Sequence, residues 1–316
     1  MVRYCALIGL ALLWGCSEKP DTRPVDDEAS AEPREETAIV DASVLDAAPS
    51  LDARVQTATD AFIPPSLPPR QDASVASACA VGPVPERVRK DLKLDAFYAK
   101  YADANGVAVL GSSAPSDASL VSACRLVTSM LAKRDDVRKA LISAKARFAI
   151  LGKDEGTAAI PEYGYRERTQ MERDQINERA RGLGGQVASC GEENILCLKG
   201  DRYWNESICV HEFAHTISTY GVFRADRTFE SRLESSYEAA KSAGILARTY
   251  RLENLQEYWA EGVQDWYDTN ASSNPPNGVH NQVNTRPELK DFDPTLYGLV
   301  EEVFPSELAW EDCHAP

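Results

Sequence analysis

The chain has 316 residues and a formal net charge of −15. This excess of acids excludes a nucleic-acid binder that relies on bulk positive charge. Apolar residues make up 43% and charged residues 26% of the sequence, as in an ordinary globular protein. No apolar run reaches the roughly 18–20 residues of a membrane-spanning helix. We therefore expect neither an integral membrane protein nor a nucleic-acid partner.

The first sixteen residues have the layout of an export signal. Arg3 gives a positive start, an apolar stretch runs over 4–14, and Gly15 and Cys16 end the segment. The end of this segment resembles a bacterial lipobox, whose cysteine is lipidated and begins the mature protein. An ordinary cleaved signal is the alternative. We predict a signal peptide over 1–16 and a lipid anchor at Cys16. Because Ser17 comes next, the outer membrane or cell surface of a bacterium is the favoured location.

Residues 17–78 are predicted to be a disordered linker rich in proline, alanine and acids. Positions 17–74 hold eight of the eighteen prolines and have a net charge of −8. Such a segment cannot bury enough apolar surface to offset the entropy lost on ordering. Its expected function is to give reach to a lipid-anchored domain.

Residues 79–316 are long enough for one large domain. Once the signal is removed and Cys16 is lipidated, six cysteines remain, and an even number in an exported chain predicts three disulfides. Spacing leaves the pairing open, but Cys190 with Cys197 is favoured because 191–194 could turn between them. Zinc binding by cysteines is disfavoured because no C-x-x-C pair occurs. The six cysteines are Cys79, Cys124, Cys190, Cys197, Cys209 and Cys313.

Apolar spacing predicts an α+β domain that is mainly helical with a small sheet. Glycines 182, 184 and 185 are expected to form a mobile turn before the strand at 195–198. We expect that strand to be the edge strand that pairs with a peptide substrate. The expected helices cover 85–105, 116–131, 163–181 and 207–220, and the expected strands cover 147–151 and 195–198.

Residues 211–215 read His-Glu-Phe-Ala-His, which is the pattern H-E-x-x-H. On a helix, His211 and His215 share one face and can bind one cation, while Glu212 lies beside the open coordination position. Because the chain has only four histidines, the pattern is expected by chance roughly 0.004 times. The alternative is a pair of solvated histidines on an amphipathic helix. We predict one Zn²⁺ ion, with Glu212 as general base.

A catalytic zinc ion needs a third protein ligand. No third histidine follows His215 at metzincin spacing, so a carboxylate on a second helix is expected. Glu257, Glu261 and Asp265 form an acidic stripe at four-residue spacing. One of these carboxylates could bind the metal, and one on the next turn could accept a hydrogen bond from a ligand histidine. A solvated acidic face is the alternative.

The segment from Ile208 to Asp268 resembles the gluzincin catalytic domain of the anthrax lethal factor family and, more loosely, the Mlc-titration-factor peptidases. The likeness rests on H-E-x-x-H followed, about forty residues later, by Tyr250 and the run Glu257-Tyr-Trp-Ala-Glu261. It implies a zincin-like metallopeptidase fold, with Glu257 as the third zinc ligand and Tyr250 directed at the reacting carbonyl. Glu261 is then expected to contact a ligand residue and not the metal itself. The resemblance covers about a fifth of the chain and implies nothing about the substrate.

A polar loop over 277–286 comes after two prolines. His280 could support the ligands or, with Tyr250, stabilise the developing oxyanion, and Arg286 could clamp a substrate carboxylate. A loop held by its own asparagines is the equal alternative. His314, near the end, is expected to be exposed and inert.

Together these features predict a zinc metallopeptidase that acts on a peptide or protein, and we expect a monomer by default. Two alternatives stay open. One is a zinc hydrolase of a non-peptide amide, and the other is a surface binding module that keeps the zincin scaffold without activity.

Overall fold

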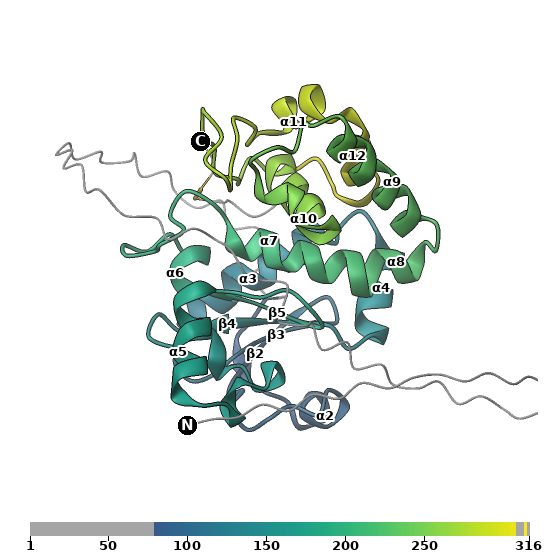
Figure 1. Cartoon of the computed structure of the whole chain (residues 1–316). Helices are drawn as coiled ribbons and strands as arrows, with labels where there is room; N and C mark the ends of the chain where they lie inside the picture. Colours follow the sequence, from purple (N-terminus) through teal and green to yellow (C-terminus); the bar gives the residue numbers. More distant parts are fainter. Residues whose placement is uncertain (1–78, 308–312, 315–316) are drawn as a thin grey trace, which may run out of the picture. The chain divides into compact units, whose positions relative to one another are not determined.

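The computed structural model describes residues 79–307 and 313–314. The predicted signal peptide, the lipidation site Cys16 and the linker all lie outside the described residues. The described part is α+β, mainly helical with one small sheet, which confirms the predicted fold class (Figure 1).

The sheet has five strands in the order β1-β2-β3-β4-β5. The first three pair antiparallel, whereas β3, β4 and β5 pair parallel, each joined to the next by a helical crossover. Strand β4 is the strand predicted at 147–151. The strands are β1 (Gly82–Pro83), β2 (Lys100–Ala104), β3 (Val107–Gly111), β4 (Arg147–Leu151) and β5 (Val187–Gly191).

The helix predicted over 85–105 is wrong for most of its length. Only α2 (Glu86–Asp91) is helical, and the segment then becomes strand β2. Asn105 and Gly106 both have positive φ and join β2 to β3 in a two-residue hairpin loop, a conformation that this dipeptide favours. Pairing with the fully buried β3 therefore overrides the helical apolar spacing.

The helices lie mainly on one side of the sheet (Figure 1). The helix beginning at Asp117 was predicted, and Ser116 caps it by accepting a hydrogen bond from the Ser119 N–H. The helices are α3 (Asp117–Met130), α4 (Asp135–Ser143), α5 (Gln170–Arg179), α6 (Glu192–Ile195), α7 (Ile208–Thr216), α8 (Phe223–Ala225), α9 (Phe229–Ser242), α10 (Leu255–Trp266), α11 (Arg286–Phe292) and α12 (Pro294–Val303). The shorter turns are η2 (Thr157–Ala159), η3 (Pro161–Tyr163), η4 (Tyr165–Glu167), the π-turn η5 (Ile217–Val222) and η6 (Tyr250–Leu252).

Helices α3 and α7 cover one face of the sheet and share its larger core with α9, α10 and α12. Phe213 of α7 meets Phe148 of β4 edge to face, with ring centroids 5.4 Å apart. The opposite face is covered by α2 and the turns around η3, where Tyr98 and Ile160 are fully buried. Helix α7 is therefore packed between the sheet and α10.

Two other predicted elements need correction. Residues 163–181 are helical only over α5, which starts at a Thr169–Glu172 capping box after short 3₁₀ turns. Residues 195–198 are not a strand but the end of α6 and the turn after it. The strand is β5, whose Val-Ala-Ser-Cys-Gly sequence is buried on both faces and so lacks the alternation that marks a half-exposed strand.

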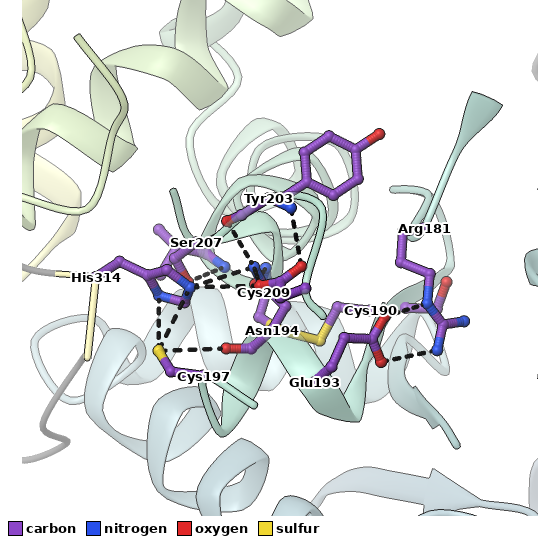
Figure 2. Close-up of a disulfide and its surroundings, with 12 residues drawn as sticks. Arg181, Cys190, Glu193, Asn194, Cys197, Tyr203, Ser207, Cys209 and His314 are labelled. Carbon is purple, nitrogen blue, oxygen red and sulfur yellow. Dashed lines mark hydrogen bonds and ion pairs between the residues drawn. A yellow bond between two sulfur atoms is a disulfide. The ribbon is translucent and has the colours of Figure 1, made fainter. Parts of the chain in front are cut away.

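Three disulfides form among the six cysteines, but the favoured pair Cys190–Cys197 is wrong. Cys190 instead pairs with Cys209, which joins β5 to the first turn of α7 (Figure 2). The other two pairs are Cys79–Cys124 and Cys197–Cys313. A pairing between 190 and 197 would need a turn there, and α6 occupies that place.

In the described part of the chain, no helix combines the length and the apolar character needed to cross a bilayer.

Candidate metal centre

The H-E-x-x-H motif lies on α7, whose start and position are fixed by its own sequence. Ser207 caps the helix by accepting a hydrogen bond from the Val210 N–H at 3.4 Å. The neighbouring apolar side chains, Val210 and Phe213 among them, are fully buried in the larger core. Packing of this face turns His211, Glu212 and His215 toward α10.

Helix α10 supplies the third group. Asn254 caps it by accepting hydrogen bonds from the N–H groups of Gln256 and Glu257 at 2.9 and 3.0 Å. The Trp259 Nε1–H donates to the Ala214 carbonyl oxygen of α7 at 3.0 Å. This contact sets the rotation of α10, so that Glu257 in its first turn faces the two histidines.

The side chains of His211, His215 and Glu257 converge. The Glu257 Oε2 atom lies 2.9 Å from His211 Nε2 and 3.4 Å from His215 Nε2. All three candidate ligand atoms lie within 4.8 Å of one another. Tetrahedral zinc with ligand bonds of about 2.0–2.2 Å needs ligand atoms a little over 3 Å apart, and two imidazoles with one carboxylate are the donors of known open catalytic sites. The geometry and chemistry of these residues therefore fit a zinc ion.

The electrostatics of the cluster favour a cation. Burial lowers the pKa of His211, but the hydrogen bond and charge of Glu257 outweigh it and raise this pKa to about 10. Burial raises the pKa of Glu257, and the two histidines more than reverse this, so its pKa is below the usual value. Both shifts have the same cause, since each stabilises positive charge on the histidines next to the Glu257 carboxylate.

Glu212 is half-buried next to these three residues. Burial raises its pKa, the two histidines oppose this effect, and the charge of Glu257 adds to it. A carboxylate whose pKa is raised toward neutrality is suited to accept and return a proton.

A glycine segment, Gly182–Gly185, packs directly against this face of α7. A Cβ atom on Gly184 would lie 2.5 Å from the His215 Cβ, and one on Gly182 would lie 3.0 Å from the Glu212 Cγ. The segment was predicted to be a mobile turn. Instead, the carbonyl oxygen of Leu183 accepts from the Ser189 N–H of β5 at 2.9 Å, and that of Gly185 accepts from the Thr216 hydroxyl at 2.6 Å. The glycines thus allow a fixed backbone to approach the motif.

Of the acidic stripe on α10, only Glu257 reaches the cluster. Each four-residue step advances an α-helix by about 40°, so Asp265 lies about 80° around from Glu257. Glu261 is 4.0 Å from His211 Nδ1 and accepts a hydrogen bond from Asn270 at 3.0 Å instead. Glu261 therefore lies in ion-pair contact with His211 but does not form a hydrogen bond with it.

The partner of His211 is Gln264, which the sequence pattern did not single out. Its Oε1 atom lies 2.7 Å from His211 Nδ1. Seven residues are close to two full turns, so Gln264 lies only about 20° around from Glu257. This seven-residue spacing is the signal in the sequence, and a pattern restricted to acids does not contain it.

Asp265, the third acid of the stripe, stabilises the fold and does not face the candidate ligands. It is fully buried, and its carboxylate forms an ion pair with Arg251, 2.5 Å from Nη2. Burial raises the pKa of Asp265 to about 7, and the charge of Arg251 opposes this shift. Because Arg251 follows Tyr250 directly, the buried pair attaches the η6 turn to α10.

Tyr250 lies next to His211, with ring centroids 6.5 Å apart and nearly parallel planes. Its backbone N–H donates to the Val279 carbonyl oxygen at 2.8 Å. Burial, followed by the charge of Glu257, raises the pKa of its hydroxyl above the usual value, so the group stays a donor. The structure thus brings Tyr250 to the cluster.

The side chain of His280 lies next to Glu206. Its Nε2 atom lies 3.7 Å from Glu206 Oε1, and its Nδ1 has no hydrogen-bond partner among the described residues. Burial raises the pKa of Glu206. The ion-pair contact of the His280 ring is thus with Glu206, a residue that no sequence motif marked, while its backbone is hydrogen-bonded to Asn277 within the loop.

Two further predictions are corrected. Arg286 has internal partners, since its Nε–H donates to the Trp266 carbonyl oxygen at 2.7 Å and its guanidinium stacks 4.4 Å from the Trp266 ring centroid. These contacts hold the Arg286 side chain against α10, so it is not positioned to bind a substrate carboxylate. His314 is buried, not exposed, and lies next to Cys197 (Figure 2). The Cys197–Cys313 disulfide holds it there, and its Nε2 is 3.8 Å from Asp201 Oδ2.

The sulfurs of Cys197 and Cys313 and a His314 nitrogen also lie close enough to hold a metal ion. Because the two sulfurs are joined in a disulfide, they are not available as thiolate ligands.

Comparison with known proteins gives little beyond this geometry. No protein-family model matches the chain, and no curated protein matches it. Among solved structures, the chain is similar to the Pro-Pro endopeptidase PPEP-2 from Paenibacillus alvei, with 15% identity and a TM-score of 0.37, over 62% of this chain and 97% of that one. A likeness this distant assigns neither a family nor an activity.

Proposed function

We propose that this protein is a zinc-dependent metallopeptidase of the gluzincin type that hydrolyses peptide bonds. One observation carries the proposal: the three donor atoms of His211, His215 and Glu257 converge, and the half-buried Glu212 lies within electrostatic reach of all three residues. Three ligands and an adjacent base are the residues that zinc hydrolysis needs.

Each residue of the cluster has its own part in this chemistry. A zinc ion held by His211, His215 and Glu257 would acidify a water molecule and polarise the substrate carbonyl. Glu212 takes the proton from the attacking water and delivers it to the leaving amine. Tyr250 donates a hydrogen bond to the oxyanion as the carbonyl carbon becomes tetrahedral.

We place the substrate-pairing edge at β5 and the adjoining segment Gly182–Gly185, and no longer at 195–198. Strand β5 is at the end of the sheet and packs against α7, and an end strand is where an extended peptide could pair. Lipidation at Cys16 and display at a bacterial surface remain proposals that rest on the sequence alone, and a peptide or protein would be the substrate there.

The test uses the full chain loaded with zinc and a diverse peptide library, with new termini identified by mass spectrometry. Glu212→Gln is the control, because it keeps the shape and the zinc ligands but removes the base. We expect cleavage by the natural sequence, and a rate lower by about 10²–10⁴-fold in the variant at equal zinc content.

Equal cleavage by both proteins would overturn the mechanism. Zinc binding without any cleavage would instead support a non-peptide amide substrate or a binding module, and cell-wall fragments would then be assayed with the same pair of proteins.

A further inference from the structure

We propose that Gln264 is a positioning residue that fixes the tautomer of His211, keeping a proton on Nδ1 and leaving the Nε2 lone pair for zinc. The inference rests on the proposed zinc chemistry and adds a residue to it. It assigns to a neutral amide the function that the sequence suggested for the carboxylate of Glu261.

The orientation of the Gln264 amide is set by its surroundings. Gln264 is fully buried, with its Nε2 atom 3.2 Å from the Ser207 carbonyl oxygen and 3.5 Å from Glu206 Oε2. A carbonyl and a carboxylate both accept hydrogen bonds, so the NH₂ group must face them. The amide oxygen then faces His211 Nδ1 at 2.7 Å, which requires an N–H at that position.

The Ser207 carbonyl that anchors this amide belongs to the start of α7. The same oxygen accepts the helical hydrogen bond from the His211 backbone N–H at 3.2 Å. The side-chain amide of Gln264 and the backbone of His211 therefore bond to one and the same atom, so the imidazole orientation is coupled to the helix that carries it.

The two histidines differ in this respect. Among the residues that the structure describes, His215 Nδ1 has no hydrogen-bond partner. Its ring is instead limited by the backbone of Gly184, where a Cβ atom would lie 2.9 Å from His215 Cδ2. Hydrogen bonding thus fixes His211, whereas steric contact restricts His215.

Gln264→Met tests the proposal, because methionine has nearly the same length and no amide. Gln256→Met is the matched control. Gln256 lies on the same helix, and its Oε1 accepts a hydrogen bond from the Ser218 hydroxyl at 3.0 Å and not from a ligand histidine ring. Zinc affinity is measured on the full chain by chelator competition, and NMR of ¹⁵N-histidine-labelled, zinc-loaded protein detects the His211 Nδ1–H.

We expect Gln264→Met to lose about 10–100-fold in zinc affinity, as outer-shell partners of ligand histidines do, and to lose the slowly exchanging Nδ1–H signal. Gln256→Met should keep both. Gln264→Glu restores an acceptor and should recover part of the affinity. Equal zinc affinity and an unchanged Nδ1–H signal in Gln264→Met would overturn the inference.

The outcomes separate this inference from the proposed function. If the natural sequence binds no zinc, the proposed function fails. If it binds zinc and cleaves peptides while Gln264→Met behaves in the same way, only the role of Gln264 fails.

Discussion

At the scale of single residues, Tyr250 is held at the cluster by its backbone and by its neighbour in sequence. The backbone N–H bonds to Val279, and the next residue, Arg251, is buried in an ion pair with Asp265 of α10. A hydroxyl fixed in this way can donate to developing charge without reorganisation, which is what makes such donors effective.

Tyr250→Phe removes only the hydroxyl. Because the donor acts on the oxyanion and binds no metal, we expect kcat to fall by about 10²–10³-fold while zinc affinity and KM stay nearly unchanged. Steady-state kinetics with a cleaved peptide and zinc titration check this. Tyr220→Phe, on a half-buried tyrosine at the π-turn after α7, serves as control. A large rise in KM at unchanged kcat would assign Tyr250 to substrate binding instead.

At the scale of elements, the close packing of Gly182–Gly185 against α7 restricts the position of the His215 side chain. Gly184 has no space for a side chain, since the nearest contact would be the Cβ of His215 at 2.5 Å. The backbone on both sides is tied to β5 and to Thr216, so it cannot easily move away.

Gly184→Ala should therefore displace His215 and weaken zinc binding by about tenfold or more, by analogy with the loss of outer-shell support. Gly298→Ala is the control, because Gly298 lies in α12 with open space around its Cα and should, if anything, gain about 0.5–1 kcal/mol of stability. Chelator competition and thermal unfolding measure the two effects. Unaltered zinc affinity in Gly184→Ala would show that the Gly182–Gly185 backbone moves and His215 keeps its position.

At the scale of the whole molecule, the Cys190–Cys209 disulfide links the sheet to α7, the helix that carries two of the candidate metal ligands. Cys209 lies two residues before His211, and Cys190 lies in the parallel strand β5. The bond closes a loop that contains α6 and the segment leading into α7. Figure 2 shows Asn194 of this loop beside the disulfide, where its Oδ1 accepts from the Cys209 N–H at 3.4 Å.

Replacing Cys190 and Cys209 by alanine should cost about 3 kcal/mol of unfolding free energy for a loop of this length, and it should also lower zinc affinity. The control removes Cys79 and Cys124, whose bond does not include α7 and closes a longer loop, with an expected cost of about 4 kcal/mol and no change in zinc affinity. Urea unfolding and chelator competition report the two quantities. Equal zinc affinity in both double variants would show that the Cys190–Cys209 bond stabilises the fold without affecting zinc binding.

The sequence predicted well where local chemistry is sufficient. The i, i+4 spacing of His211 and His215 places both on one face of any helix, and Ser116 marks the start of α3 with its capping side chain. It predicted poorly where a partner far along the chain decides the outcome. The β2 segment has helical apolar spacing and becomes a strand because β3 lies beside it, and β5 shows no alternation because both of its faces are covered.

By itself, the sequence determined the H-E-x-x-H helix, the mainly helical α+β class and the small set of carboxylates from which a third ligand could come. Only the tertiary structure decided among those carboxylates, paired the cysteines and brought Gln264 to His211. The physical reason is that the motif is set by the geometry of one helix. Its partners depend on the rotation of α10 against α7, which side-chain packing such as that of Trp259 on Ala214 establishes.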